Sequence, residues 1–95
     1  MIIQMVKFET KLPFEDVLNV ARGRAPEFRK IAGLVQKYYV RTDRPNQYAG
    51  VYIWDSPDSM KKYRESDLAA SIPQAYQVLA PPEVEIYDVA FTLRD

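Results

Sequence analysis

One stretch near the middle of the chain restricts the possible folds most: Gln47 to Pro57, which reads Gln-Tyr-Ala-Gly-Val-Tyr-Ile-Trp-Asp-Ser-Pro. Its first part is rich in aromatic and β-branched residues, which favour a well-buried strand. Its last part predicts a helix start, because Ser56 can accept a hydrogen bond from a free helical N–H and Pro57 suits the first helical turn. The stretch therefore predicts a strand that leads directly into a helix. Alternation along this strand places four residues on one face: Tyr48, Gly50, Tyr52 and Trp54.

Apolar periodicity predicts the other elements along the chain. We expect strands at residues 2–10, 34–41 and 83–93, a first helix that begins at Phe14 and ends at Ala32-Gly33, a second helix from Pro57 to about Glu65, a short helical segment at 68–72 and irregular chain at 73–82. Pro26 lacks the N–H that a helix interior requires, so we expect a kink or a break near residues 22–25.

The element order β-α-β-β-α-β is that of the split ferredoxin-like pattern. The chain has 95 residues and is expected to be a single domain, residues 1–95. Its fold class is therefore predicted to be α+β, with a four-stranded antiparallel sheet and helices on one face. Every predicted strand carries large apolar side chains on both faces, and a monomer would expose one of these faces. This pattern predicts a homodimer in which two sheets pack face to face.

Composition argues against several classes of function. Lys and Arg total 13 and so do Asp and Glu, whereas proteins that bind nucleic acid through its phosphates usually have a basic excess. No apolar run approaches the ~18 residues of a membrane span, and no signal-peptide pattern opens the chain. Cysteine is absent, which fits a cytoplasmic protein. Histidine is also absent, which removes the usual general base and the commonest ligand of zinc, iron and haem, so no metal or cofactor is expected.

Two stretches resemble the dimeric α/β-barrel superfamily, and within it most of all the small YdhR-type monooxygenases. One is Ala32 to Tyr38 (Ala-Gly-Leu-Val-Gln-Lys-Tyr), where the chain leaves the first helix through a glycine; the other is Ala49 to Trp54, followed by Asp-Ser-Pro and a helix that carries Tyr63. The resemblance implies a homodimer with a pocket between sheet and helices in each subunit. It also implies oxygenation of a small aromatic, phenolic or polyketide-like substrate without a cofactor. The haem-degrading branch relies on a histidine that this chain lacks.

The candidate site residues follow from the chemistry that the resemblance implies. Cofactor-independent oxygenation needs a dry cavity, a stacking surface and a group that accepts a proton or stabilises an anion. The candidate catalytic residues are Trp54, Tyr63 and Asp88. The candidate substrate-binding residues are Tyr38, Tyr39, Tyr52, Met60, Arg41 and Arg64. Arg41 or Arg64 would stabilise a phenolate, and Lys37 or Asp88 would handle a proton if desolvation shifted its pKa.

A purely structural role is open for each of these residues. Aromatic residues on strands and an inward-facing Met60 are often simply core. Lys37 and Arg41 share a face with Tyr39 and would equally suit the dimer-facing side or the sheet edge. A β-bulge would equally turn Asp88 to solvent. Three functions are therefore carried forward: a small dimeric monooxygenase or a related isomerase or lyase, a non-catalytic dimer that binds or senses a small molecule, and a protein whose aromatic rows are wholly structural.

Overall fold

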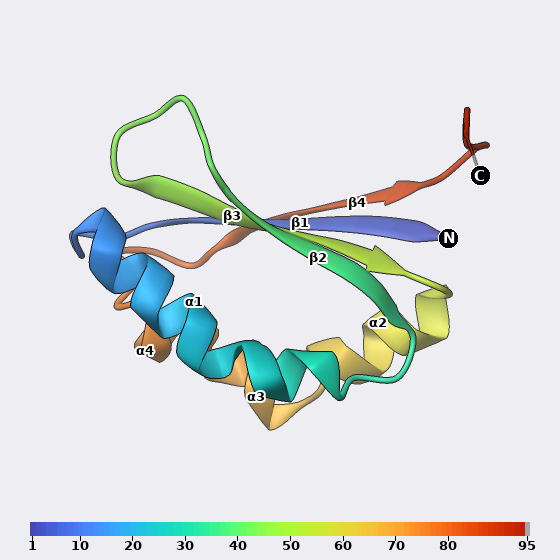
Figure 1. Ribbon diagram of the computed structural model, residues 1–95, viewed down its shortest axis with the longest axis horizontal. Coiled ribbons are helices and arrows are strands. Elements are labelled where there is room, and N and C mark those ends of the chain that lie inside the picture. The colour runs from blue at the N-terminus through green and yellow to red at the C-terminus, as the bar shows by residue number, and fades with distance from the viewer. Residues whose placement is uncertain (95) are drawn as a thin grey trace.

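A computed structural model describes residues 1–94 of the chain (Figure 1). Its strands are β1 (Ile2–Glu9), β2 (Leu34–Arg41), β3 (Gln47–Trp54) and β4 (Glu83–Asp88), and its helices are α1 (Phe14–Arg29), α2 (Pro57–Arg64), α3 (Asp67–Ala70) and α4 (Ile72–Ala75). The strands form one sheet in the order β2-β3-β1-β4, with every neighbouring pair antiparallel. This is the predicted α+β ferredoxin-like fold, and the fold class is confirmed.

The helices cover one face of the sheet and leave the other face bare (Figure 1). On β1, alternate residues from Ile2 to Phe8 are buried on the helix-facing side. The register pairs Phe8 with Tyr48 and Gln4 with Tyr52, and paired residues in a sheet point to the same face. The aromatic row of β3, which includes Tyr48, Tyr52 and Trp54, therefore faces the helices. Strand alternation alone does not show which face of the strand the helices cover.

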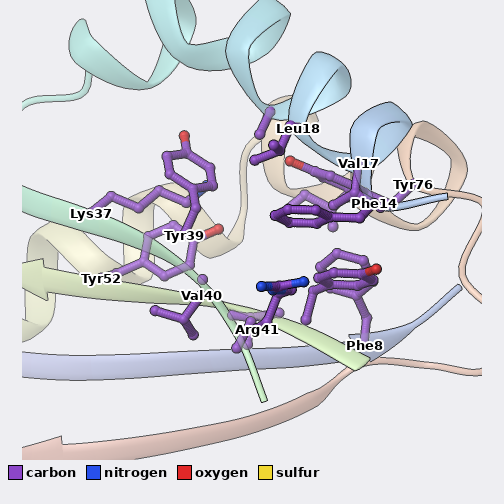
Figure 2. Close-up of a pocket in the computed structure, with 16 residues that line it drawn as sticks. Phe8, Phe14, Val17, Leu18, Lys37, Tyr39, Val40, Arg41, Tyr52 and Tyr76 are labelled. Atoms are coloured by element: carbon purple, nitrogen blue, oxygen red, sulfur yellow. The ribbon is translucent and has the colours of Figure 1, made fainter. Parts of the chain in front are cut away.

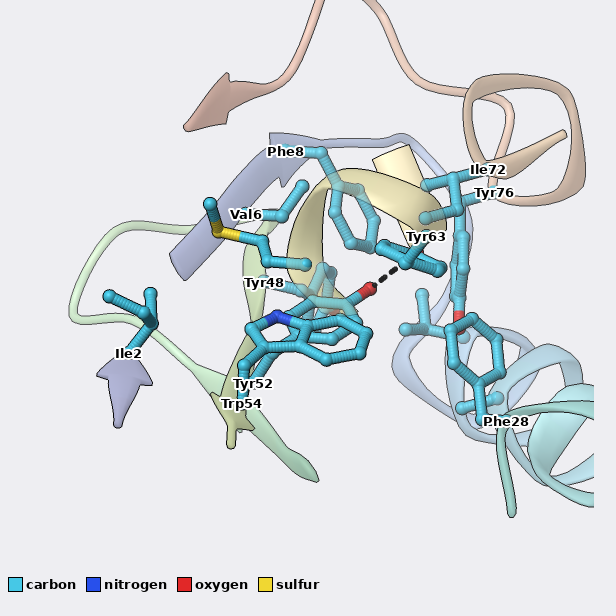
Figure 3. Packing of buried hydrophobic residues seen from close by; sticks show 13 residues of the cluster. Ile2, Val6, Phe8, Phe28, Tyr48, Tyr52, Trp54, Tyr63, Ile72 and Tyr76 are labelled. Atoms are coloured by element: carbon cyan, nitrogen blue, oxygen red, sulfur yellow. Dashed lines mark hydrogen bonds between the residues drawn. The ribbon is translucent and has the colours of Figure 1, made fainter. Parts of the chain in front are cut away.

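The centre of the core is aromatic (Figure 3). The rings of Tyr52 and Trp54 stack with centroids 6.0 Å apart, and the two side chains are 1% and 0% exposed. Tyr63 from α2 lies 5.3 Å from each of these rings, and Phe28 from α1 packs beside them. The indole N–H of Trp54 donates to Oε1 of Gln4 at 2.9 Å. The polar atom of the most buried side chain is therefore paired, as burial in a core requires.

Two residues that the sequence marked as a helix cap and a turn, Ser56 and Gly33, form the junctions around β2, β3 and α2. Ser56 caps α2, because its hydroxyl oxygen accepts from the Ser59 N–H at 3.2 Å. Gly33 links α1 to β2 with a φ of 85°, a left-handed conformation that favours glycine. Its carbonyl accepts from the Asp55 N–H at 2.9 Å, which ties this turn to the start of α2.

The helical regions differ from the sequence prediction in two places. Helix α1 continues through Pro26 to Arg29, so the chain does not break before Pro26, and the helix ends earlier than the predicted Ala32-Gly33. Part of the stretch predicted to be irregular forms α4, where Pro73 is tolerated because it lies in the first turn. Within residues 1–94, no helix combines the length and the hydropathy needed to cross a membrane.

Strand β4 is shorter than the predicted strand at 83–93. It ends at Asp88, which pairs with Ile2, the first residue of β1. One more backbone bond follows, from the Val89 N–H to the Met1 carbonyl at 3.1 Å. The neighbouring strand has then ended, so the residues that follow have no ladder to join, and Phe91 is 82% exposed.

The bare face of the sheet is apolar, as the sequence predicted. Tyr38 on β2 and Tyr87 on β4 are 55% and 48% exposed on this side. Between them lie partly buried aliphatic side chains of the two central strands: Ile3, Met5, Val51 and Ile53. An ion pair between Lys7 and Glu85, 2.8 Å long, lies toward the β4 edge of the same face.

Candidate functional site

A cavity of about 160 Å³ lies between α1, α4 and the helix-facing side of the sheet (Figure 2). Its walls are mainly apolar and aromatic, and include Phe8, Phe14, Val17, Leu18, Tyr39, Tyr52 and Tyr76. A basic side chain lies toward each end. Lys37 and Arg41 are four residues apart on β2, so their backbones are separated by roughly 13 Å at the usual rise of a strand.

Lys37 lies at the end of the cavity nearest Phe28. Its Nζ is 3.5 Å from the ring centroid of Phe28 and 4.5 Å from the centroids of Tyr39 and Tyr52. Burial, together with the nearby positive charge of Arg24, lowers the pKa of Lys37 to about 7. The three ring faces attract the ammonium form and oppose part of this shift. Lys37 therefore exchanges a proton close to neutral pH, the condition under which the sequence analysis proposed it as a proton acceptor.

Two phenol rings, those of Tyr39 and Tyr52, contact this amine, and a third phenol, that of Tyr63, is hydrogen-bonded to Tyr52. The hydroxyl oxygens of Tyr52 and Tyr63 are 3.1 Å apart in a buried hydrogen bond (Figure 3). Burial is the main reason why the pKa values of Tyr52, Tyr63 and Tyr39 are all raised. The phenols therefore keep their protons at neutral pH. They are hydrogen-bond donors, whereas the uncharged form of Lys37 is a proton acceptor.

The other end of the cavity opens toward solvent at Phe14 and Arg41. The guanidinium carbon of Arg41 lies 4.2 Å from the ring centroid of Phe14. The ring of Phe14 in turn stacks on Tyr48 with centroids 6.1 Å apart and an angle of 2° between the planes. Because Arg41 is always charged and still solvent-exposed, it is suited to attract an anionic group to this mouth.

A second cavity of about 230 Å³ lies between β1, β4 and the segment from α2 to α4. Tyr63 and Arg64 of α2 line it, as does the amide of Gln4, whose oxygen is bonded to the Trp54 indole. Val6 and Ile72 line both cavities, so these two aliphatic side chains lie between them.

The structure divides the candidate residues of the sequence analysis into three groups. Four of them line the first cavity: Lys37, Tyr39, Arg41 and Tyr52. Two line the second cavity: Tyr63 and Arg64. Four line neither of these cavities: Tyr38, Trp54, Met60 and Asp88.

The residues of the third group lie outside the cavities for different reasons. Trp54 and Met60 are buried in the core, at 0% and 8% exposure. Tyr38 points to the bare face, because it pairs with Val51 on that side of the sheet. Asp88 is exposed at the end of an edge strand, and no bulge turns it outward, since the register with β1 is continuous from Lys7↔Glu83 to Ile2↔Asp88.

Several lining residues are absent from the candidates of the sequence analysis. Phe14 and Leu18 are four residues apart on α1, a spacing that puts both on one helix face, so helical periodicity was a usable signal. Tyr76 lies in the stretch that was predicted to be irregular, where no periodicity points inward. Across residues 1–94, no three or more His, Cys, Asp or Glu side chains lie close enough together to hold a metal ion.

No protein-family model matches this sequence, and no curated protein matches it. Solved structures do match the fold. A predicted antibiotic biosynthesis monooxygenase from Deinococcus radiodurans is 13% identical with a TM-score of 0.77, covering 100% of this chain and 98% of that one. SnoaB, a cofactor-independent oxygenase from Streptomyces nogalater, is 17% identical with a TM-score of 0.77, covering 99% and 97%. A predicted antibiotic biosynthesis monooxygenase from Nitrosomonas europaea is 13% identical with a TM-score of 0.77, covering 96% and 100%.

At these identities the comparison defines the fold alone. The chain has the ferredoxin-like α+β fold of the antibiotic biosynthesis monooxygenase structures over nearly its whole length. Function on a shared fold has to be argued from the site.

Proposed function

We propose that this protein is a cofactor-independent monooxygenase that acts on a small phenolic substrate in the first cavity. The observation that carries this proposal is the position of Lys37, an amine with a pKa of about 7 at one end of an aromatic-walled cavity. A base that titrates near the working pH is the most effective proton acceptor. The likeness in fold to SnoaB, a cofactor-independent oxygenase, supports the same reaction class.

The size of the cavity favours a small substrate. Its volume of about 160 Å³ is close to the ~150 Å³ that accommodates benzene in a protein core, and below the ~300 Å³ at which drug-sized pockets begin. A phenol or hydroquinone with one aromatic ring fits such a space, whereas a substrate with three or four fused rings does not. Of the substrates that the resemblance implied, we therefore propose the small aromatic one.

The proposed reaction begins with proton transfer from the substrate hydroxyl to the Lys37 amine. The resulting phenolate is electron-rich and transfers one electron to O₂, and the two radicals combine to form a carbon–oxygen bond at a ring C–H position. Loss of that ring proton and of water, to which the Lys37 ammonium returns a proton, leaves a quinone. One oxygen atom of O₂ is then in the product and the other is in water. Arg41 stabilises the anion electrostatically, and the aromatic walls exclude bulk water from the radical pair.

We propose that the protein works as a homodimer in the cytoplasm. The apolar bare face of the sheet supports the dimer, because a monomer rarely exposes a continuous apolar surface of this kind. The absence of cysteine fits a reducing compartment. Neither nucleic acid nor a membrane is proposed as a partner.

Oxygen consumption tests the proposed reaction. With methylhydroquinone as substrate, the protein should consume O₂ above the rate of spontaneous oxidation and place one ¹⁸O atom from ¹⁸O₂ in the hydroxyquinone product. Anthrone, with three rings, should react more slowly. Replacing the proton acceptor in Lys37→Met should lower kcat by about 10²-fold or more.

The matched control is Lys30→Met, the same substitution at a lysine whose side chain is 73% exposed, and it should leave kcat unchanged. Equal kcat values for Lys37→Met and the wild type would contradict the role of Lys37. Saturable binding of methylhydroquinone without any oxygen uptake would replace the monooxygenase with the binding or sensing function.

A further inference from the structure

We infer that the Lys37 amine is also a covalent site, at which a one-ring aromatic aldehyde is captured reversibly as a Schiff base. The reaction uses the same cavity and the same amine as the proposed oxygenation but requires no O₂, so the two reactions can be measured separately. The inference rests on where the amine lies, what surrounds it and how much space faces it.

The position of the amine is set by the strand that carries it. Lys37 pairs with Tyr52 on the helix-facing side of the sheet, and its stem passes over Gly50. A Cβ at Gly50 would lie only 3.2 Å from Cε of Lys37 and 2.9 Å from the Tyr52 ring, so the glycine provides the room that the stem occupies. The amine then ends 3.5 Å from the centroid of Phe28, at the wall of the cavity.

Within residues 1–94, no carboxylate forms an ion pair with this amine. The ion pairs formed within residues 1–94 join Lys7 to Glu85 and Lys30 to Glu27, and neither includes Lys37. A lysine that stabilises a fold usually keeps its ammonium in water or pairs it with a carboxylate. Lys37 is partly buried, its ammonium lies against aromatic rings, and within residues 1–94 it forms no ion pair with a carboxylate, an environment that favours the uncharged, nucleophilic amine.

The charged and titratable groups near the amine come from every element packed around it. The amine contacts the rings of Tyr39 on β2 and Tyr52 on β3, and the charge of Arg24 on α1 acts on it. Tyr63 on α2 is hydrogen-bonded to Tyr52, and Tyr76 after α4 lines the same cavity beside Phe8. Arg24 is the cation among them, and its guanidinium is held by the Leu68 carbonyl at 3.1 Å and the Ser71 hydroxyl at 3.0 Å. Its charge and burial of the amine together give Lys37 a pKa of about 7, while all four phenols have raised pKa values.

This arrangement supplies both groups that Schiff-base formation needs. The Lys37 lone pair attacks the aldehyde carbon and forms a C–N bond, and the resulting carbinolamine loses its hydroxyl group as water. The proton for that departure comes from a neighbouring donor such as the Tyr39 phenol, which then regains a proton from the iminium nitrogen. One aldehyde and one amine give one imine and one water, with no oxidant or reductant. A cavity of about 160 Å³ limits the aldehyde to about one ring.

The experiment is site-resolved labelling of the wild-type protein under anaerobic conditions at pH 7. The probe is 4-hydroxybenzaldehyde, with sodium cyanoborohydride to reduce any imine to a stable amine, followed by peptide mass spectrometry. An ordinary lysine of pKa ~10.4 has about one amine in 2,500 uncharged at pH 7, whereas about half of Lys37 is uncharged, so Lys37 should be labelled at least about tenfold faster even after its lower nucleophilicity is allowed for.

Two comparisons separate capture in the cavity from general lysine chemistry. 9-Anthraldehyde, which has three rings, should label the exposed Lys30 but not Lys37. The rate of labelling at Lys37 should be half-maximal near pH 7. Lys37→Arg keeps the positive charge but has no nucleophilic amine, and it should lose the fast-labelled site.

Labelling of Lys37 at the same rate as Lys30, or equal labelling by the one-ring and three-ring aldehydes, would overturn the inference. Both results come from the wild-type protein, so they hold even if Lys37→Arg does not fold. Fast labelling of Lys37 without oxygen uptake would support the covalent site and contradict the proposed oxygenase. Oxygen uptake without fast labelling would support the oxygenase and contradict the covalent site.

Discussion

At Lys37, burial and aromatic contact act on the ammonium in opposite directions. Burial removes water from the charge and favours the neutral amine, while the rings of Phe28, Tyr39 and Tyr52 offer their negative faces to the cation. Arg24 adds a repulsion that no nearby carboxylate offsets. The balance lowers the pKa to about 7 and makes the charge of this residue depend on pH in the physiological range.

This lowered pKa predicts how stability depends on pH. The ordinary lysine pKa is 10.5 and the folded value is about 7, so between these values the unfolded chain binds more protons and stability rises with pH. Below pH 7 the cost of burying the ammonium is fully present. From pH 7 to 10, the free energy of unfolding of the wild type should rise relative to that of Lys37→Met by roughly 1–3 kcal/mol. This is less than the full pKa shift implies, because the ring contacts and residual water partly stabilise the buried ammonium.

Urea unfolding at intervals between pH 6 and pH 10 measures this difference. Lys30→Met is the control, because the side chain of Lys30 is 73% exposed and its removal should leave the pH dependence parallel to that of the wild type. Parallel curves for Lys37→Met as well would mean that the Lys37 pKa is not lowered in the folded protein.

At the scale of elements, one glycine inside α1 and one just after it should respond to alanine in opposite directions. Gly33 has a φ of 85°, and a Cβ there would lie 2.1 Å from the Ser59 hydroxyl oxygen, so Gly33→Ala strains the turn and pushes it away from α2. Gly23 lies inside α1 with nothing within 4 Å of its would-be Cβ. Gly23→Ala should therefore stabilise the protein by about 0.5–1 kcal/mol, whereas Gly33→Ala should destabilise it by more than that.

Thermal unfolding of the two variants measures both signs in one experiment. A stable Gly33→Ala protein would mean that the turn between α1 and β2 moves freely relative to α2. A destabilised Gly23→Ala protein would mean that the middle of α1 is not a regular helix in solution.

The elements themselves were largely predictable because their signals are local. The Ser56 cap, the glycine after α1 and the period-two alternation of β1 and β3 each act over a few residues, and the structure contains all of them. The errors fall where a local signal competes with the tertiary structure. Pro26 is accommodated inside α1, and β4 ends at Asp88, opposite Ile2 at the end of β1, which the sequence of β4 alone does not indicate.

The candidate site was less predictable, because alternation along a strand shows which face of the sheet a side chain points to. It does not show how deeply that side chain is buried or which side chains it contacts. Tyr52 and Trp54 share a face of β3, yet Tyr52 lines the first cavity while Trp54 is sealed in the core. Adjacent Tyr38 and Tyr39 had to point to opposite faces, and only the packing of α1 determines which of them meets the cavity. The sequence predicted that Phe14 is a helix residue, but nothing in it indicated that Phe14 lies at the mouth of the cavity.

At the scale of the whole molecule, the bare face of the sheet predicts the assembly. If two sheets pack face to face, sedimentation equilibrium at micromolar concentration should give the mass of a dimer. A charge on that surface, as in Tyr38→Glu on edge strand β2, should shift the protein toward the monomer, because an unpaired buried carboxylate is strongly unfavourable.

The matched control for this prediction is Leu79→Glu. Leu79 is 55% exposed, like Tyr38, but it lies outside the strands, in the segment that leads to β4. Its substitution should leave the dimer intact. A wild-type protein that sediments as a monomer at micromolar concentration would contradict the face-to-face arrangement and require another explanation for the apolar surface.

Val6 and Ile72 separate the two cavities, so substitutions at these positions should change how much space a ligand can occupy. Cavities of about 160 and 230 Å³ share these two aliphatic side chains in their linings, so we expect a smaller residue at position 72 to open a connection between them. On the proposed function, the number of rings in the substrate would then depend on one or two side chains and not on the fold. A single substitution at position 72 would change the space available and leave the proposed proton acceptor on β2 where it is.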